Sequence, residues 1–272
     1  MSVAKKEYKR ITVKTLSDMK VNNEKITMLT AYDYSMAKIV DNAGIEVILV
    51  GDSASNVMAG HETTLPITLD QMIYHASCVV RACKRALIVV DLPFGSYQSD
   101  SKLALHSAIK IMKESGAHAV KLEGGQEVKK SIKRIINAGI PVMGHLGLTP
   151  QSIYKFGTYA VRAKEEMEAN RLLEDAKILE ETGCFALILE KVPASLAKKV
   201  AQSISIPVIG IGAGGDVDGQ VLVLHDMLGM THEFNPRFLR RYMNLYEDMN
   251  CAIGNFITDV KLVDFPNANE EY

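Results

Sequence analysis

One short phrase recurs along the chain: the end of a helical pattern, a glycine, one or two further residues, and then a run of apolar residues. It occurs as NAGIEVILV, ESGAHAVKL, NAGIPVMG and ETGCFALIL. Glycine is the usual residue just past a helix end, where the backbone turns left-handed. The apolar run is continuous rather than alternating, which indicates a parallel strand buried on both faces. The phrase therefore predicts an α/β fold built from repeated helix–strand units.

Eight apolar runs of this kind begin at residues 26, 47, 86, 119, 141, 186, 207 and 220. Helical patterns separate most of them, for example YSMAKIVDNAG, LALHSAIKIMKESG and ANRLLEDAKILEETG. Eight such units suit a (β/α)8 TIM barrel. A doubly wound open sheet is the alternative, although eight units favour closure. The segment between the last two runs is too short for a full helix.

The flanking segments predict additional helices. TVKTLSDMKVN reads as an extra N-terminal helix that covers one end of the barrel, and NPRFLRRYMNLYEDMNCAIGNFITDVKL reads as one or two closing helices. The tail, about 264–272, has no core-forming pattern and is predicted to be mobile. No segment resembles a linker, so residues 1–272 are predicted to form a single domain with the barrel at about 26–257.

Composition excludes several classes of protein. The formal net charge is −1 and the charges are scattered, so neither nucleic acid nor an acidic membrane is an expected partner. No apolar run approaches the roughly 18 residues of a spanning helix, and MSVAKKEYKRITVKTL lacks the apolar core of a secretory signal. The cysteines, Cys78, Cys83, Cys184 and Cys251, have neither disulfide nor zinc-site spacing and are predicted to be reduced thiols. We expect a cytoplasmic protein.

Four apolar runs end on an acid: VILVGDS on Asp52, LIVVDLPF on Asp91, VKLEGG on Glu123 and LILEKVP on Glu190. In a (β/α)8 barrel the carboxyl ends of the strands carry the active site. Each acid by itself could instead cap a helix or orient a turn. Four acids at one mouth favour a site, because clustered carboxylates repel one another unless a cation or a proton lies between them.

The ligand types indicate which cation. Carboxylates with no cysteine or paired histidine beside them favour Mg²⁺ over Zn²⁺. We expect Asp52 and Asp91 to bind the metal directly and Glu123 to hold a metal-bound water. Glu190 would then be free to act as a general base.

Two further polar residues are predicted at the same mouth. Lys121 lies two residues before Glu123 and so points to the same face of its strand, and His145 follows the apolar run of the next strand. A single strand-end histidine is often structural, but with Lys121 it could bind an anionic carboxylate or a carbonyl oxygen. Mg²⁺, Lys, His and a carboxylate base together predict enolisation of a 2-oxo acid.

One motif is a false lead. Gly210, Gly212 and Gly215 match the GxGxxG pattern of dinucleotide-binding sites. That pattern requires a helix next, whereas DVDGQVLVL reads as loop and strand. The glycines are therefore expected to allow close backbone approach beside the pocket.

A longer set of motifs resembles one family, the ketopantoate hydroxymethyltransferases. The motifs are LTAYD (29–33), LVGDS (49–53), TLPITLDQMIYH (64–75), VVDLPFGSY (89–97), KLEGG (121–125), PVMGHLGLTPQS (141–152), LILEKVP (187–193) and PVIGIGAGGDVDGQVLVLHDMLG (207–229). The resemblance covers about residues 8–257, in the family's order.

The resemblance implies a barrel of the phosphoenolpyruvate/pyruvate type, one Mg²⁺ per subunit and a homodecamer. It also implies hydroxymethyl transfer from 5,10-methylenetetrahydrofolate to 3-methyl-2-oxobutanoate, giving 2-dehydropantoate for pantothenate and coenzyme A synthesis. Its site residues, matched by motif, are Asp52, Asp91 and Glu123 for the metal, Ser53, Asp91, Lys121 and His145 for the oxo acid, and Glu190 as the base.

The sequence departs from the family pattern at GTYAVRAK (157–164) and in the loop GDSASNVMAGHETT. These departures bear on folate contacts and loop detail rather than on the metal or base positions. Two other functions compete: a Mg²⁺-dependent carbon–carbon lyase on a 2-oxo or 2-hydroxy acid, and an inactive barrel that serves in assembly. The second would be expected to lose Glu190 or an aspartate ligand, and all are present.

Overall fold

The computed structural model describes residues 9–272 as two compact units, divided between Val223 and Leu224. The first eight residues, on which part of the prediction about a secretory signal falls, lie outside the described range.

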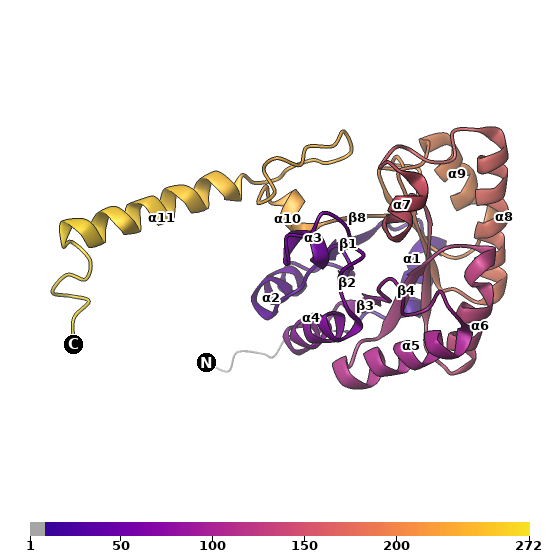
Figure 1. Cartoon of the computed structure of the whole chain (residues 1–272), viewed down its shortest axis with the longest axis horizontal. Coiled ribbons are helices and arrows are strands. Elements are labelled where there is room, and N and C mark those ends of the chain that lie inside the picture. The colour runs from indigo at the N-terminus through magenta and orange to yellow at the C-terminus, as the bar shows by residue number, and fades with distance from the viewer. Residues whose placement is uncertain (1–8) are drawn as a thin grey trace. The chain divides into compact units, whose positions relative to one another are not determined.

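The first unit is a closed barrel of eight parallel strands arranged in sequence order (Figure 1). Strand β1 pairs with β8 as well as with β2, so the open-sheet alternative is wrong and the (β/α)8 prediction is confirmed. The strands are β1 (Ile26–Thr30), β2 (Val47–Val50), β3 (Leu87–Asp91), β4 (Ala119–Glu123), β5 (Val142–Gly147), β6 (Ala186–Glu190), β7 (Val208–Ile211) and β8 (Gly219–Leu222).

Helices cover the outside of the barrel; Figure 1 shows α4, α5, α6 and α8 around the strands. The helices are α1 (Val13–Val21), α2 (Tyr34–Asn42), α3 (Ala54–Val57), α4 (Leu69–Ala82), α5 (Ser101–Ser115), α6 (Lys129–Asn137), α7 (Ile153–Phe156), α8 (Glu166–Thr182) and α9 (Ala194–Ser203), with 3-10 turns η1 (Gln126–Val128) and η2 (Pro150–Ser152).

Local sequence explains the helix ends. The side chains of Asp33 and Asp100 accept hydrogen bonds from the first turns of α2 and α5. Helices α5 and α8 end at Gly116 and Gly183, both in the left-handed conformation that the repeated phrase predicts. Within the described part of the chain no helix separates β7 from β8, so Gly210, Gly212 and Gly215 precede a loop and not a nucleotide-binding helix.

Helix α1 is the predicted extra helix, and it lies at the amino ends of the strands. The Ile11 amide donates to Arg85 O just before β3, and the Lys20 ammonium donates to Ile206 O just before β7. Ile11 and Leu16 belong to the same apolar cluster as the inward-facing residues of all eight strands. Apolar side chains therefore fill this end, and polar side chains collect at the opposite end.

The second unit contains α10 (Leu224–Met227) and α11 (Leu245–Leu262). Arg241 organises the segment between them by donating to the carbonyl oxygens of His232 and Phe234. Helix α11 has no buried residue, and no helix within residues 9–272 is long and apolar enough to cross a membrane. The mobility of the tail and the single-domain boundaries stay predictions.

Candidate active site

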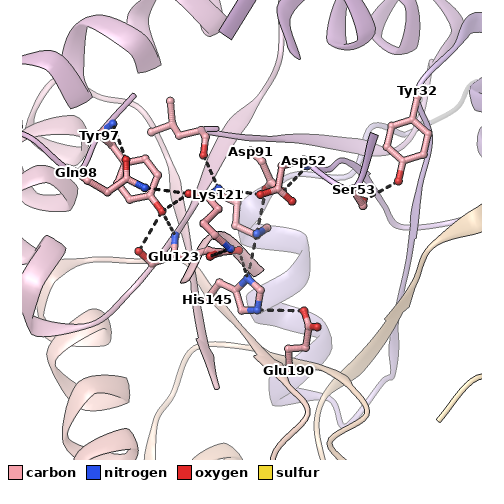
Figure 2. Close-up of polar contacts among 12 residues, drawn as sticks. Tyr32, Asp52, Ser53, Asp91, Tyr97, Gln98, Lys121, Glu123, His145 and Glu190 are labelled. Atoms are coloured by element: carbon pink, nitrogen blue, oxygen red, sulfur yellow. Dashed lines mark hydrogen bonds and ion pairs between the residues drawn. The ribbon is translucent and has the colours of Figure 1, made fainter. Parts of the chain in front are cut away.

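The strand register brings the predicted residues together at the carboxyl ends of the strands. Asp91 pairs with Lys121 across β3 and β4. Glu123 pairs with His145 across β4 and β5, and Gly147 pairs with Glu190 across β5 and β6. Figure 2 shows the side chains of Asp91, Lys121, His145 and Glu190 converging on one region.

Asp52 and Asp91 are joined through the backbone. The Asp52 amide donates to Oδ2 of Asp91 over 3.0 Å, while Oδ1 of Asp91 lies 3.1 Å from the Lys121 ammonium. Both aspartates are buried, and burial raises both pKa values. For Asp91 the pKa reaches about 7, because burial and the nearby Asp52 charge outweigh the opposing effect of Lys121.

Among residues 9–272, Lys121 is the single lysine buried beside these acids. Burial by itself lowers its pKa, but Asp91, Glu123 and Asp52 together outweigh that effect and raise it, so the ammonium stays charged. An ammonium can only donate hydrogen bonds. Its 3.1 Å contact with Nδ1 of His145 therefore requires Nδ1 to be the acceptor.

His145 is consequently a neutral imidazole with its hydrogen on Nε2. Burial, followed by the charge of Lys121, lowers its pKa well below the ordinary value. The 3.6 Å approach of Nδ1 to Glu123 is therefore not an ion pair. Nε2 is buried without a hydrogen-bond partner among the described residues, and it lies 3.5 Å from Oε2 of Glu190.

Glu190 has the properties of a base that works near neutral pH. Burial raises its pKa to about 7, against the lowering effects of Lys121 and Lys191. Its side chain keeps 17% of its surface exposed, so solvent and a small molecule can reach it. The Glu190 carboxylate, which can accept a proton, thus lies beside the Nε2–H group of His145, which can donate a hydrogen bond.

Ser53 follows Asp52, and its Oγ lies 2.8 Å from the hydroxyl of Tyr32. Figure 2 shows these two side chains pointing toward each other. The contact of Ser53 with substrate stays a prediction.

The carboxylate oxygens provide a test of whether a cation fits. Oε1 of Glu123 is buried without a hydrogen bond from any described residue, and Oδ1 of Asp91 has only the 3.1 Å ion pair with Lys121. Unsatisfied buried acceptors of this kind are costly unless a ligand meets them. Within residues 9–272 no group of three or more His, Cys, Asp or Glu side chains is placed to hold a metal ion together. Buried carboxylate oxygens fit a cation that takes one or two carboxylates and completes its shell with water and substrate, which is typical of Mg²⁺.

Two further residues of the site, Gln151 and Tyr97, were not predicted from the sequence. Gln151 is buried in η2, and its side chain donates to Oδ2 of Asp52 over 2.8 Å. The Tyr97 hydroxyl donates to Oε1 of Gln151 over 2.8 Å and lies 3.2 Å from the Glu123 amide, which donates to it. A polar residue directly after Pro150 in the loop that follows β5 was the available signal, but the direction of a loop side chain cannot be read from sequence.

Buried acids, a lysine and a neutral histidine at the carboxyl ends of eight parallel strands place this chain among the (β/α)8-barrel enzymes. The profile of the ketopantoate hydroxymethyltransferase family matches residues 10–268, and the chain belongs to that family.

Individual proteins agree with this assignment. The 3-methyl-2-oxobutanoate hydroxymethyltransferase of Flavobacterium johnsoniae is 78% identical over 272 residues, which is 100% of both chains. Among solved structures, 2,3-dimethylmalate lyase, a member of the PEP mutase/isocitrate lyase superfamily, has a TM-score of 0.58 at 13% identity, covering 81% of this chain and 84% of its own. Phosphonopyruvate hydrolase in complex with oxalate and Mg²⁺ has a TM-score of 0.59 at 11% identity, covering 96% and 93%. These solved structures share the barrel fold.

Proposed function

We propose that this chain transfers a hydroxymethyl group from 5,10-methylenetetrahydrofolate to 3-methyl-2-oxobutanoate, giving 2-dehydropantoate for pantothenate synthesis. Family membership supports the reaction. The observation that carries the mechanism is the pairing of Glu190, with its pKa near 7, and the open Nε2–H of His145, 3.5 Å apart.

Glu190 acts as the general base in this mechanism. It takes the proton from C3 of the oxo acid, and that carbon bonds to the methylene carbon of the folate. The two bonds from the methylene carbon to the folate nitrogens break, water supplies the hydroxyl oxygen, and the protons of Glu190 and of the water pass to those nitrogens. A base whose pKa lies near the working pH combines a deprotonated population with useful basicity, and such a group contributes roughly 10²–10⁴ in rate. Its partial exposure gives the substrate access.

His145 and Lys121 bind the oxygen atoms of the substrate in this mechanism. The Nε2–H of His145 donates to an oxygen that gains negative charge as the proton leaves. A neutral imidazole suits this role, because its donor hydrogen is held in place by the bond from the Lys121 ammonium to Nδ1. Lys121 itself keeps a positive charge in the site, which favours an anionic oxo acid.

Asp52 and Asp91 would hold Mg²⁺, with Glu123 accepting from a metal-bound water. Four buried or half-buried carboxylates around one ammonium, together with the open Oε1 of Glu123, support a divalent cation there. When bound, Mg²⁺ supplies Lewis-acid stabilisation of the charge that develops on the oxo acid.

The test is proton NMR of 3-methyl-2-oxobutanoate in D₂O with the purified protein and Mg²⁺. The C3 proton signal is expected to disappear, and EDTA or the Glu190→Gln substitution is expected to reduce that exchange by at least about 10². The matched control is Glu181→Gln, an exposed glutamate of α8, which should exchange at the wild-type rate. Unchanged exchange in Glu190→Gln would remove Glu190 from the role of base, and absence of exchange in the wild type with both Mg²⁺ and tetrahydrofolate present would refute the substrate.

The remaining partners are also proposals. We expect a homo-oligomer, a decamer by family resemblance, located in the cytoplasm. Apolar side chains of α11, including Met249, Ile253, Phe256 and Val260, are exposed and recur at helical spacing, which supports an interface on that helix. Sedimentation of the purified protein measures the assembly directly.

A further inference from the structure

Gln151 joins four successive strand ends of the site. It follows β5, its side-chain amide donates to Asp52 after β2 and to the Leu92 carbonyl after β3, and its backbone amide donates over 3.0 Å to Oε2 of Glu123 at the end of β4. These contacts lie at the mouth of the barrel, although Asp52 and Gln151 are far apart in the sequence.

Every hydrogen-bonding atom of the Gln151 side chain is used. Nε2 donates to Oδ2 of Asp52 over 2.8 Å and to the Leu92 carbonyl over 3.0 Å. Oε1 accepts from the Tyr97 hydroxyl over 2.8 Å and from Nε2 of Gln98 over 3.0 Å. Only a side-chain amide offers two donors and two acceptors in this shape.

The direction of this network is set by a backbone group. The Gly95 amide can only donate, and it donates to Oε1 of Gln98 over 2.8 Å. Gln98 must then present its NH₂ group to Oε1 of Gln151, and Gln151 must present its own NH₂ group to Asp52. The loop after β3 therefore determines which face of the amide meets the carboxylate.

In each of the three acids predicted at the metal site, one carboxylate oxygen accepts a hydrogen bond from a protein N–H group. The side chain of Gln151 donates to Oδ2 of Asp52, and its backbone amide donates to Oε2 of Glu123. The backbone amide of Asp52 donates to Oδ2 of Asp91. One oxygen of each acid is thereby held by an N–H group. Of the remaining oxygens, Oδ1 of Asp91 meets the Lys121 ammonium at 3.1 Å. Oδ1 of Asp52 and Oε1 of Glu123 are left for a cation or its water.

We infer that Gln151 is a positioning residue, which holds Oδ2 of Asp52 so that Oδ1 faces the cation. The inference rests on the proposed Mg²⁺ site. It assigns Gln151 no contact with substrate. Outer partners that orient metal ligands contribute about 10–100-fold to metal affinity or activity.

The experiment compares Gln151→Met with wild type. Met keeps the length and volume of Gln but can form none of the four side-chain bonds. The matched control is Gln126→Met, an exposed glutamine that lies outside the network. Calorimetric titration with MgCl₂ measures the Kd for Mg²⁺, and thermal unfolding in EDTA measures Tm without the metal. Turnover at increasing Mg²⁺ concentration gives two values, the Mg²⁺ concentration for half-maximal turnover and kcat at saturating Mg²⁺.

Gln151→Met is expected to raise the Kd for Mg²⁺ and the Mg²⁺ concentration for half-maximal turnover by about 10–100-fold. Saturating Mg²⁺ is expected to recover most of kcat, and Gln126→Met to match wild type. A merely structural Gln151 would lower Tm and leave both Mg²⁺ values unchanged, and that result would overturn the inference while leaving the proposed function intact. A wild-type protein that exchanges the C3 proton without binding Mg²⁺ would refute the metal site itself.

Discussion

Replacing Lys121 with Met removes the ammonium that is buried among the acids of the site. The Lys121 and Asp91 side chains are 4% and 2% exposed, and their charged atoms lie 3.1 Å apart. Coulomb's law at an effective dielectric constant of about 20 gives roughly 5 kcal/mol for unit charges at that distance. Removing one partner of a buried pair costs about 3–5 kcal/mol, because the other charge is left without compensation. Met keeps most of the side-chain volume, so a cavity contributes little.

The loss of stability is expected to depend on pH. The pKa of Asp91 is already raised from 3.8 to about 7, and it rises further when the ammonium is removed. A carboxyl group whose pKa is higher in the folded than in the unfolded protein binds its proton more tightly when folded, so protonation favours folding. The penalty in Lys121→Met should therefore be larger at pH 8 than at pH 5.5, where Asp91 is protonated in both folded proteins.

The assay is urea unfolding in EDTA at both pH values, with the free energy of unfolding taken from the midpoint and slope. The control is Lys110→Met, which breaks an exposed ion pair with Asp70 of the same chemical type. That variant should unfold close to wild type, because exposed pairs contribute little. Equal losses in the two variants at pH 8, or a Lys121→Met penalty that does not shrink at pH 5.5, would refute the reasoning.

Three further outcomes are expected. Burial raises the pKa of Glu190 to about 7, and only its carboxylate form is a base. The rate of deuterium exchange at C3 of the oxo acid should therefore fall tenfold per pH unit below about 7 and level off above it. A rate independent of pH from 5 to 8 would contradict this. Gly147→Ala should lower the free energy of unfolding by about 1–3 kcal/mol more than Gly139→Ala, and it should lower kcat. Both glycines have positive φ, but only at Gly147 would a Cβ lie 2.3 Å from the Glu190 carbonyl oxygen. Urea unfolding and turnover of the two variants measure the difference. Millimolar MgCl₂ should raise the Tm of wild type and leave that of Asp91→Asn nearly unchanged, and equal increases would exclude Asp91 as a ligand.

Much of the fold could be predicted from local patterns. Continuous apolar runs and glycines at helix ends depend on residues close together in the chain, so the order of helices and strands follows from short segments such as ESGAHAVKL. The absence of a helix between β7 and β8 was predicted because the segment between these two apolar runs is too short to form one. Chain direction then places Asp91 and Glu190 at the carboxyl ends of their strands, which meet at one mouth in any parallel barrel.

The tertiary structure decided how those side chains work. Neutral His145, with its hydrogen on Nε2, depends on the ammonium of Lys121 lying 3.1 Å from Nδ1, and that contact requires β4 and β5 to pair in one particular register. Gln151 could not be selected from sequence, because its bond to Asp52 joins residues 99 positions apart. The sequence by itself determined which residues stand at the strand ends, through chain direction and local pattern. Barrel closure and strand register decided which atoms meet, because hydrogen bonds and pKa values depend on distances and burial that exist only after folding.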